Sequence, residues 1–209
     1  MVQQSPMVSE AGASSWYEGK TFATDWTTWH FPNWLKWLAP YRDRKVRVLE
    51  IGSWEGRSAL FFLNYLPHAR LVCVDTFEGS VEHQAADDAA TFLPQVEKRF
   101  DTNTSAFANR IEKIKGHSAN VLPRLALAGQ RFDIAYVDGS HLAADVYSDG
   151  ALTWPLIARG GLVIFDDYKL ELTPTPQENA KLGIDTFTAA FAGQYSIIHF
   201  DYQVALVKL

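Results

Sequence analysis

The sequence has 209 residues, a length that suits one large domain with a sizeable hydrophobic core. Hydrophobic residues make up 47% of it and charged residues 21%, ordinary globular values that exclude a disordered or fibrous chain. The net charge of -5 and the lack of a basic aromatic stripe speak against a nucleic-acid partner, and the single cysteine, Cys73, excludes an intrachain disulfide and a thiolate zinc cluster.

The amino-terminal region is polar and small over its first fifteen residues, which predicts disorder there. It lacks the basic stretch followed by an apolar stretch that marks a secretory leader, and nowhere do eighteen apolar residues follow one another. We therefore expect a cytoplasmic protein without a membrane partner.

Tryptophan is concentrated in residues 16–41, which hold five of the seven tryptophans of the chain. Pro32 suits the first turn of a helix that ends near residue 39. Such a helix places Trp34 and Trp37 on one packing face.

We divide the chain into an aromatic extension, residues 1–41, and a main domain, residues 42–209. The extension could form a lid over an active site, a contact in a homodimer, or a helix packed on the edge of a sheet. Packing fits the large area that tryptophan side chains bury.

From residue 46 onward, short β-rich segments alternate with helical patterns, which is typical of a mostly parallel sheet covered by helices on both faces. The predicted fold class is α/β, a doubly wound sheet of seven mostly parallel strands whose last two form an antiparallel hairpin. The predicted strands are 46–51, 71–75, 111–115, 132–138, 161–166, 195–201 and 203–208. The predicted helices are 57–65, one within 89–109, 119–127, 141–157 and 178–191.

The first strand leads into the most distinctive local motif, Glu50-Ile-Gly52-Ser-Trp-Glu-Gly56-Arg-Ser58. Gly52 and Gly56 permit a tight turn and close approach of a ligand, and the free N–H groups of the next helix favour an anion over Ser58. The spacing Glu-x-Gly-x-x-x-Gly differs from the Gly-x-Gly-x-x-Gly of dinucleotide sites. By itself the turn also fits a structural connection between strand and helix.

The next predicted strand ends in Asp75, where a carboxylate can accept both hydroxyls of an adenosine ribose. The glycine turn, Asp75 and the closing hairpin together resemble the class I S-adenosylmethionine-dependent methyltransferases. This likeness extends from residue 46 to the end of the chain and implies a Rossmann-like fold. It implies that the cofactor contacts are Glu50, Gly52, Ser53, Trp54, Gly56, Ser58, Asp75, Thr76, His117, Ser118, Ala119 and Asp138.

The resemblance also implies a role for each part of this cofactor site. Residues 52–54 would line the methionine and ribose, Ser58 would hold the methionine carboxylate, and Asp75 would bind the ribose hydroxyls. Residues 115–119, which follow the third predicted strand, are similar to the turn that contacts adenine.

Two strongly apolar segments end in acid, one at Asp138 and the other at Asp166 and Asp167. If the two strands are parallel neighbours, the three carboxylates meet at one edge of the sheet, where open α/β folds place ligands. Three carboxylates crowd together only with something positive between them, and a hard divalent cation is the simplest partner. Any one of these acids alone fits a cap at a strand end equally well.

The pattern Val-Asp138-Gly-Ser-His141, followed after a helix by Phe-Asp166-Asp167, is similar to the metal-dependent O-methyltransferases. The likeness is greatest to the branch that contains macrolide sugar O-methyltransferases and cephalosporin-hydroxylase-like proteins. It implies Asp138, Asp166 and Asp167 as magnesium ligands.

Methyl transfer needs a nucleophilic oxygen, and an alcohol becomes one when its proton is removed. A metal chelated by two adjacent substrate oxygens orients and acidifies the acceptor. His141, at the start of the next predicted helix, is placed to act as general base, although a lone histidine also fits a residue that only fills space. Asp145 and Asp149 follow on the same helical side, where they either orient the imidazole or face solvent.

The predicted function is magnesium-dependent O-methylation, by S-adenosylmethionine, of a vicinal hydroxyl on a small sugar-bearing or phenolic metabolite. Asp138 and His141 are the predicted catalytic residues. A metal-independent methyltransferase and a non-catalytic relative that only binds the cofactor stay open. A nucleotide-dependent reductase is a weaker alternative, because the glycine spacing and the closing hairpin speak against it.

Overall fold

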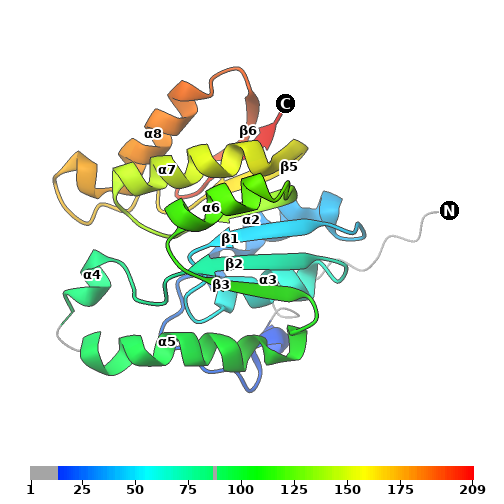
Figure 1. Cartoon of the computed structure of the whole chain (residues 1–209), viewed down its shortest axis with the longest axis vertical. Coiled ribbons are helices and arrows are strands. Elements are labelled where there is room, and N and C mark those ends of the chain that lie inside the picture. Colours follow the sequence, from blue (N-terminus) through cyan, green and yellow to red (C-terminus); the bar gives the residue numbers. More distant parts are fainter. Residues whose placement is uncertain (1–13, 87–88) are drawn as a thin grey trace.

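A seven-stranded sheet forms the centre of the computed structural model, which describes residues 14–86 and 89–209 (Figure 1). The strands are β1 (Arg47–Ile51), β2 (Arg70–Asp75), β3 (Ile111–Lys115), β4 (Phe132–Val137), β5 (Ile157–Phe165), β6 (Tyr195–Phe200) and β7 (Val204–Lys208). Their order is β3-β2-β1-β4-β5-β7-β6. The first five are parallel, and β7 pairs antiparallel with both β5 and β6, so the predicted α/β sheet with its closing hairpin is confirmed.

Helices cover both faces of this sheet. One layer consists of α2 (Phe31–Leu38), α3 (Arg57–Tyr65) and α5 (Ala89–Thr104), and the other of α6 (Ser118–Leu127), α7 (Ala143–Thr153) and α8 (Ala180–Ala190). The short helix α4 (Val81–Gln84) follows β2. Single 3-10 turns occur at Ser15–Tyr17, Thr28–His30, Ala39–Tyr41, Ser105–Phe107, Trp154–Leu156 and Pro176–Glu178. No helix in the described parts of the chain combines the length and apolarity needed to cross a bilayer.

The strands divide their side chains between two hydrophobic cores. Val48 of β1 and Leu71 of β2 pack with the layer that contains α3, whereas Leu49 and Val72, one residue further on, pack with the layer that contains α6 and α7. This alternation follows from the two-residue period of a strand, and apolar residues on both faces mark a sheet buried on both sides.

Helix α7 differs most from its prediction, which was 141–157. Its start is delayed because Leu142 is extended, with φ -72° and ψ 130°. It ends at Thr153 because Pro155 lacks the N–H and has no room for its ring within a continuing α-helix, so the chain takes a 3-10 turn. Strand β5 then begins at Ile157, earlier than the predicted residue 161. The predicted disorder of the first fifteen residues lies outside the described residues, except for the last two positions.

Helix α2 packs its tryptophans into the core, as the helical spacing predicted. Trp34 is fully buried, stacks on Phe62 with ring centroids 5.2 Å apart, and donates its Nε1–H to Gln203 Oε1 at 2.8 Å. Trp37 is buried as well. The tryptophan of the preceding 3-10 turn, Trp29, is 54% exposed.

Replacing Trp34 with Phe should lower the free energy of unfolding by about 1–3 kcal/mol, because a buried Gln203 oxygen loses its donor. Urea titration measures the change. The matched control, Trp29→Phe at an exposed position, should stay within about 0.5 kcal/mol of the unsubstituted protein. Equal losses in the two variants would contradict a buried hydrogen-bonding role for Trp34.

Candidate active site

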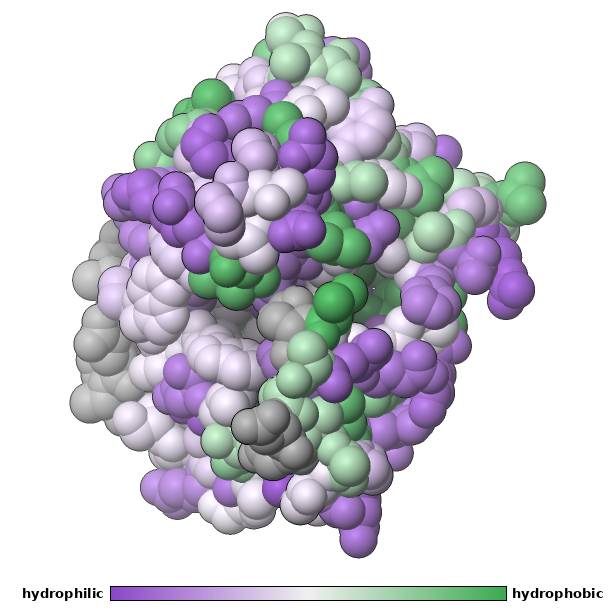
Figure 2. All heavy atoms as spheres, turned by 90° about the vertical axis from the view of Figure 1, so that its left-hand side faces the viewer, coloured by the Kyte–Doolittle hydropathy of each residue, from purple (hydrophilic) through white to green (hydrophobic). Residues whose placement is uncertain are grey.

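A cavity of about 590 Å³ opens at the carboxyl ends of the parallel strands. Figure 2 shows the side on which α4 lies in Figure 1, and the surface there is hollowed near its centre. Residues from the glycine turn, the end of β2, the turn before α6, the acid-ended strands and the amino-terminal segment line the cavity. This is the edge of the sheet at which open α/β folds bind ligands.

Gly52 brings the glycine turn into direct contact with the first acid of the cluster. Its φ is 83°, and a Cβ atom on Gly52 would lie 1.8 Å from the backbone oxygen of Asp138. Only glycine tolerates both the conformation and this approach. The Asp138 N–H also donates to the Ile51 oxygen at 2.9 Å, so the ends of β1 and β4 are joined beside the cavity.

Asp75 holds the same turn from the other side. Its Oδ2 accepts the N–H groups of Ser53 at 2.6 Å and Trp54 at 2.7 Å, and its Oδ1 accepts that of Phe77 at 2.6 Å. Burial raises the pKa of Asp75, although these three N–H groups oppose the rise. Asp75 also lies on the wall of the cavity.

Glu50 lies beneath the turn and is not among the residues that line the cavity. Its Oε2 accepts the hydroxyl of Ser53 at 2.6 Å and the thiol of Cys73 at 3.2 Å, and Ser58 also bonds to it. Burial raises the pKa of Glu50 and, well above its usual value, that of Cys73. Glu50 therefore supports the turn from below, and Cys73 is a free, buried thiol.

All the other predicted cofactor contacts except Gly56 lie on the cavity wall. Gly56 immediately precedes α3 with φ 83°, and a Cβ there would lie 2.9 Å from Thr104. Ser118, the first residue of α6, bonds to Asp149 of α7. Burial raises the pKa of Asp149 to about 7, while Ser118 opposes the rise and the charge of Asp145 adds to it. The wall residues are Gly52, Ser53, Trp54, Ser58, Asp75, Thr76, His117, Ser118, Ala119 and Asp138.

The three predicted carboxylates gather around Tyr136, which is fully buried in β4. Its hydroxyl contacts Asp138 Oδ2 at 2.9 Å and also Asp166 Oδ2. One hydroxyl proton thus serves two carboxyl groups. Burial, and then the charges of its acidic neighbours, raise the pKa of Asp138 well above its usual range and that of Asp166 to about 7. The cluster is therefore short of positive charge.

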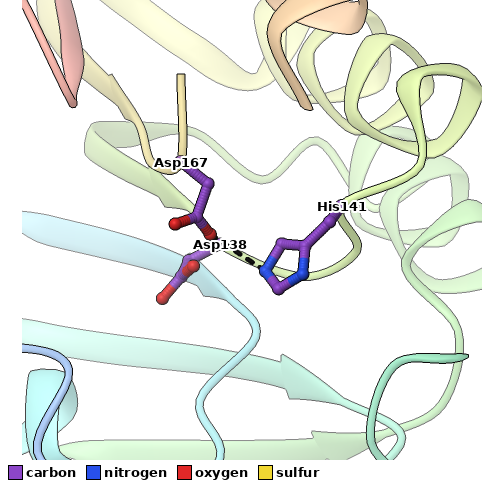
Figure 3. Close-up of side chains that lie close together, drawn as sticks. All are labelled: Asp138, His141 and Asp167. Atoms are coloured by element: carbon purple, nitrogen blue, oxygen red, sulfur yellow. Dashed lines mark ion pairs between the residues drawn. The ribbon is translucent and has the colours of Figure 1, made fainter. Parts of the chain in front are cut away.

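Asp167 and His141 face each other at the cavity, as Figure 3 shows. His141 Nε2 lies 2.9 Å from Asp167 Oδ2. Asp138, His141 and Asp167 each offer a ligand atom, and these atoms lie within 4.8 Å of one another. Carboxylate oxygens are the ligands that hard divalent cations prefer, so this donor set fits such an ion.

Asp166 lies behind this group of three. It is buried, and its oxygens accept the N–H of Asp167 at 2.8 Å and the side-chain amide of Gln203 at 2.9 Å, in addition to the bond with Tyr136. The three predicted cation ligands therefore differ by one residue from the three side chains whose ligand atoms lie close together, which include His141 in place of Asp166.

Asp167, rather than an acid of α7, contacts the imidazole of His141. Asp145 accepts the hydroxyl of Ser140 at 2.8 Å, and Asp149 bonds to Ser118. Asp149 is buried and Asp145 is exposed. The two acids therefore lie in different environments, although they were expected to share one side of the helix.

Sequence reasoning missed four residues of the acid cluster: Tyr136, Tyr202, Gln203 and His30. Tyr202 donates its hydroxyl to Asp167 Oδ1 at 2.8 Å, and His30 Nε2 lies 3.5 Å from Asp166 Oδ1. Burial lowers the pKa of His30 to about 4. Of these four, only Tyr136 could have been predicted from a local pattern. Residues two apart on a strand share a face, and Asp138 follows Tyr136 by two positions.

The chain is similar in sequence to known methyltransferases. Residues 49–168 match the family model described as a methyltransferase domain. Mycinamicin VI 2''-O-methyltransferase of Micromonospora griseorubida is 27% identical over 148 residues, which cover 66% of this chain and 31% of that protein.

Solved structures share the fold. The MycE methyltransferase of mycinamycin biosynthesis, in complex with Mg, SAH and mycinamycin VI, has a TM-score of 0.67 at 22% identity and covers 97% of this chain and 54% of its own. An O-methyltransferase from Bacillus cereus in complex with SAH has a TM-score of 0.65 at 16% identity, over 100% of this chain and 94% of its own. The chain thus spans 31% of the curated relative and 54% of the MycE chain.

Asp149→Asn should remove a pH-dependent loss of stability. With a folded pKa of about 7 against an ordinary value of 3.8, Asp149 holds its proton more tightly in the folded state, so its contribution to stability falls as pH rises through that window. Between pH 5 and pH 8 the free energy of unfolding of the unsubstituted protein should fall by on the order of 2 kcal/mol more than that of the variant.

Urea unfolding at the two pH values measures this difference, and the acid cluster contributes equally to both proteins. The exposed Asp43, which does not line the cavity, provides the control, since Asp43→Asn should keep the original pH slope. An unchanged slope in Asp149→Asn would show that its carboxyl group is not the titrating one.

Proposed function

Because the chain belongs to the methyltransferase-domain family, we propose that it transfers the methyl group of S-adenosylmethionine to a hydroxyl oxygen of a small molecule, with magnesium at the acid cluster. The contact between Gly52 and Asp138 supports this most directly, because it joins a nucleotide-type glycine turn and an acid cluster within one cavity. The MycE complex with Mg and SAH supports the same pair of ligands.

The donor occupies the half of the cavity formed by the glycine turn, the end of β2 and the turn before α6. Asp75 binds the ribose hydroxyls, and the free N–H groups at the start of α3, near Ser58, attract the methionine carboxylate. Glu50 acts by supporting the turn from below. Gly56 acts by shaping the turn into α3. The proposed donor contacts are Gly52, Ser53, Trp54, Ser58, Asp75, Thr76, His117, Ser118, Ala119 and Asp138.

The cation belongs to Asp138 and Asp167, with Asp166 as the third carboxylate of the site. The shared proton of Tyr136 and the raised pKa values of Asp138 and Asp166 support this assignment, since crowded acids gain most from a positive partner. When bound, a divalent cation orients an acceptor with adjacent oxygens and lowers the pKa of its hydroxyl.

His141 removes the proton from the acceptor hydroxyl. Asp167, whose Oδ2 lies 2.9 Å from His141 Nε2, stabilises the imidazolium that forms. As the proton leaves, the acceptor oxygen bonds to the methyl carbon and the bond from that carbon to sulfur breaks. The products are the methyl ether and S-adenosylhomocysteine.

The acceptor is proposed to be a vicinal diol on a sugar-bearing or phenolic metabolite. The curated relative, a 2''-O-methyltransferase acting on mycinamicin VI, supports the sugar-bearing class. Within the aromatic extension, Trp26 and Trp29 are 51% and 54% exposed and line the cavity, which suits the apolar faces of sugar or phenolic rings. We infer that the extension walls the acceptor side of the site.

Asp75→Ala should weaken binding of S-adenosylhomocysteine at least tenfold, measured by calorimetry. The ribose hydroxyls lose their acceptor, as do two N–H groups of the glycine turn and that of Phe77 after β2. Asp185→Ala is the control, because Asp185 accepts Tyr168 and Lys181 away from the cavity and its loss should leave the affinity within about twofold. If Asp75→Ala bound S-adenosylhomocysteine as tightly as the unsubstituted protein, the methyl donor would not bind at this turn.

Asp138→Ala should lower magnesium-dependent methylation of vicinal diols by at least about a hundredfold, because the cation loses a central ligand and the acceptor its orientation. Transfer of labelled methyl groups to a panel of glycosidic and phenolic diols measures it. EDTA should abolish the methylation activity of the unsubstituted protein, and added magnesium should restore that activity. Turnover that survives EDTA would indicate a metal-independent enzyme, and donor binding without any methylated diol would indicate a non-catalytic relative.

A further inference from the structure

Asp167 has a strained backbone. Its φ is 61°, in the left-handed region, and among the described residues only Trp54 and Phe77 share a positive φ without being glycine. Such conformations cost on the order of 1 kcal/mol and persist where the surroundings over-determine them. We call residues 166–168, which follow β5, the acid loop. Contacts from outside this loop must therefore hold Asp167 in place.

The turn between β6 and β7 holds it. The Tyr202 carbonyl accepts the N–H of Tyr168 at 2.8 Å, and the Tyr202 hydroxyl donates to Asp167 Oδ1 at 2.8 Å. In the next position, Gln203 donates its side-chain amide to Asp166 Oδ2 at 2.9 Å. The turn therefore bonds to three successive residues of the acid loop, Asp166, Asp167 and Tyr168.

The same turn is itself fixed by the amino-terminal segment. Gln203 is 1% exposed, and its Oε1 accepts the indole N–H of Trp34. The ring of Trp29 packs edge-on against the ring of Tyr202, with centroids 4.6 Å apart at 74°. Tyr202 can thus serve as a rigid support for Asp167 rather than as a mobile surface side chain.

On the basis of the cation site proposed above, we propose that Tyr202 is a positioning residue for the acid cluster. Its hydroxyl fixes Asp167 Oδ1, which turns Oδ2 toward His141 and the cation position. A carboxylate held at both oxygens cannot rotate away from the cavity. Outer partners that orient metal ligands in this way are typically worth about 10-fold to 100-fold in metal affinity.

Tyr202→Phe tests this role by removing one oxygen atom and keeping the ring that packs against Trp29. Tyr168→Phe is the matched control. Tyr168 adjoins Asp167 in the chain, but its hydroxyl donates to Asp185 at 2.9 Å and does not line the cavity. The probe is Mn²⁺, titrated into the full chain saturated with S-adenosylhomocysteine and followed by electron paramagnetic resonance.

Tyr202→Phe should bind Mn²⁺ at least about tenfold more weakly than the unsubstituted protein, and Tyr168→Phe should stay within about twofold. Affinity for S-adenosylhomocysteine should be equal in all three proteins, because the hydroxyl that Tyr202→Phe removes bonds to Asp167 and not to the glycine turn.

Unchanged Mn²⁺ affinity in Tyr202→Phe would overturn the positioning role and leave the proposed function standing. If the unsubstituted protein bound S-adenosylhomocysteine but no Mn²⁺, the cation site itself would fail, and the role of Tyr202 with it. A matching fall in S-adenosylhomocysteine affinity or in unfolding midpoint, beyond that of the control, would reduce Tyr202 to a structural residue.

Discussion

The contact between Gly52 and the backbone of Asp138 is the constraint on which the rest of the site depends. Strands β1 and β4 are parallel neighbours, and their ends approach so closely that a side chain on Gly52 would overlap the Asp138 carbonyl. This approach merges the glycine turn and the acid cluster into one cavity. A donor held by the first and an acceptor held by the second then lie within reach of each other, which is what group transfer requires.

The acid cluster is held together against its own repulsion. Burial and mutual charge raise the pKa values of Asp138 and Asp166, and a single hydroxyl proton of Tyr136 serves both. Such an arrangement costs folding free energy, and proteins retain it where it serves function. Partners from distant parts of the chain offset the cost, since Gln203 bonds to Asp166 and Tyr202 to Asp167.

Four of the five tryptophans of the aromatic extension form two groups with different roles. Trp34 and Trp37 are buried and attach the segment to the core, and Trp34 reaches the acid cluster through Gln203. Trp26 and Trp29 remain half exposed at the cavity. The segment therefore links the hydrophobic core to the wall of the site, so that packing of α2 and the shape of the cavity are not independent.

The sequence by itself determined the α/β class, the closing hairpin, the glycine turn and the three acids at strand ends, because apolar periodicity and turn chemistry are local. Only the tertiary structure decided that Glu50 lies beneath the turn, that Asp167 rather than Asp145 or Asp149 contacts His141, and that Tyr202 supports Asp167. These pairings join residues that no local pattern relates, since the packing of separate elements sets the distance between their side chains. Hydrogen bonds and ion pairs depend on that distance, and chain spacing does not encode it.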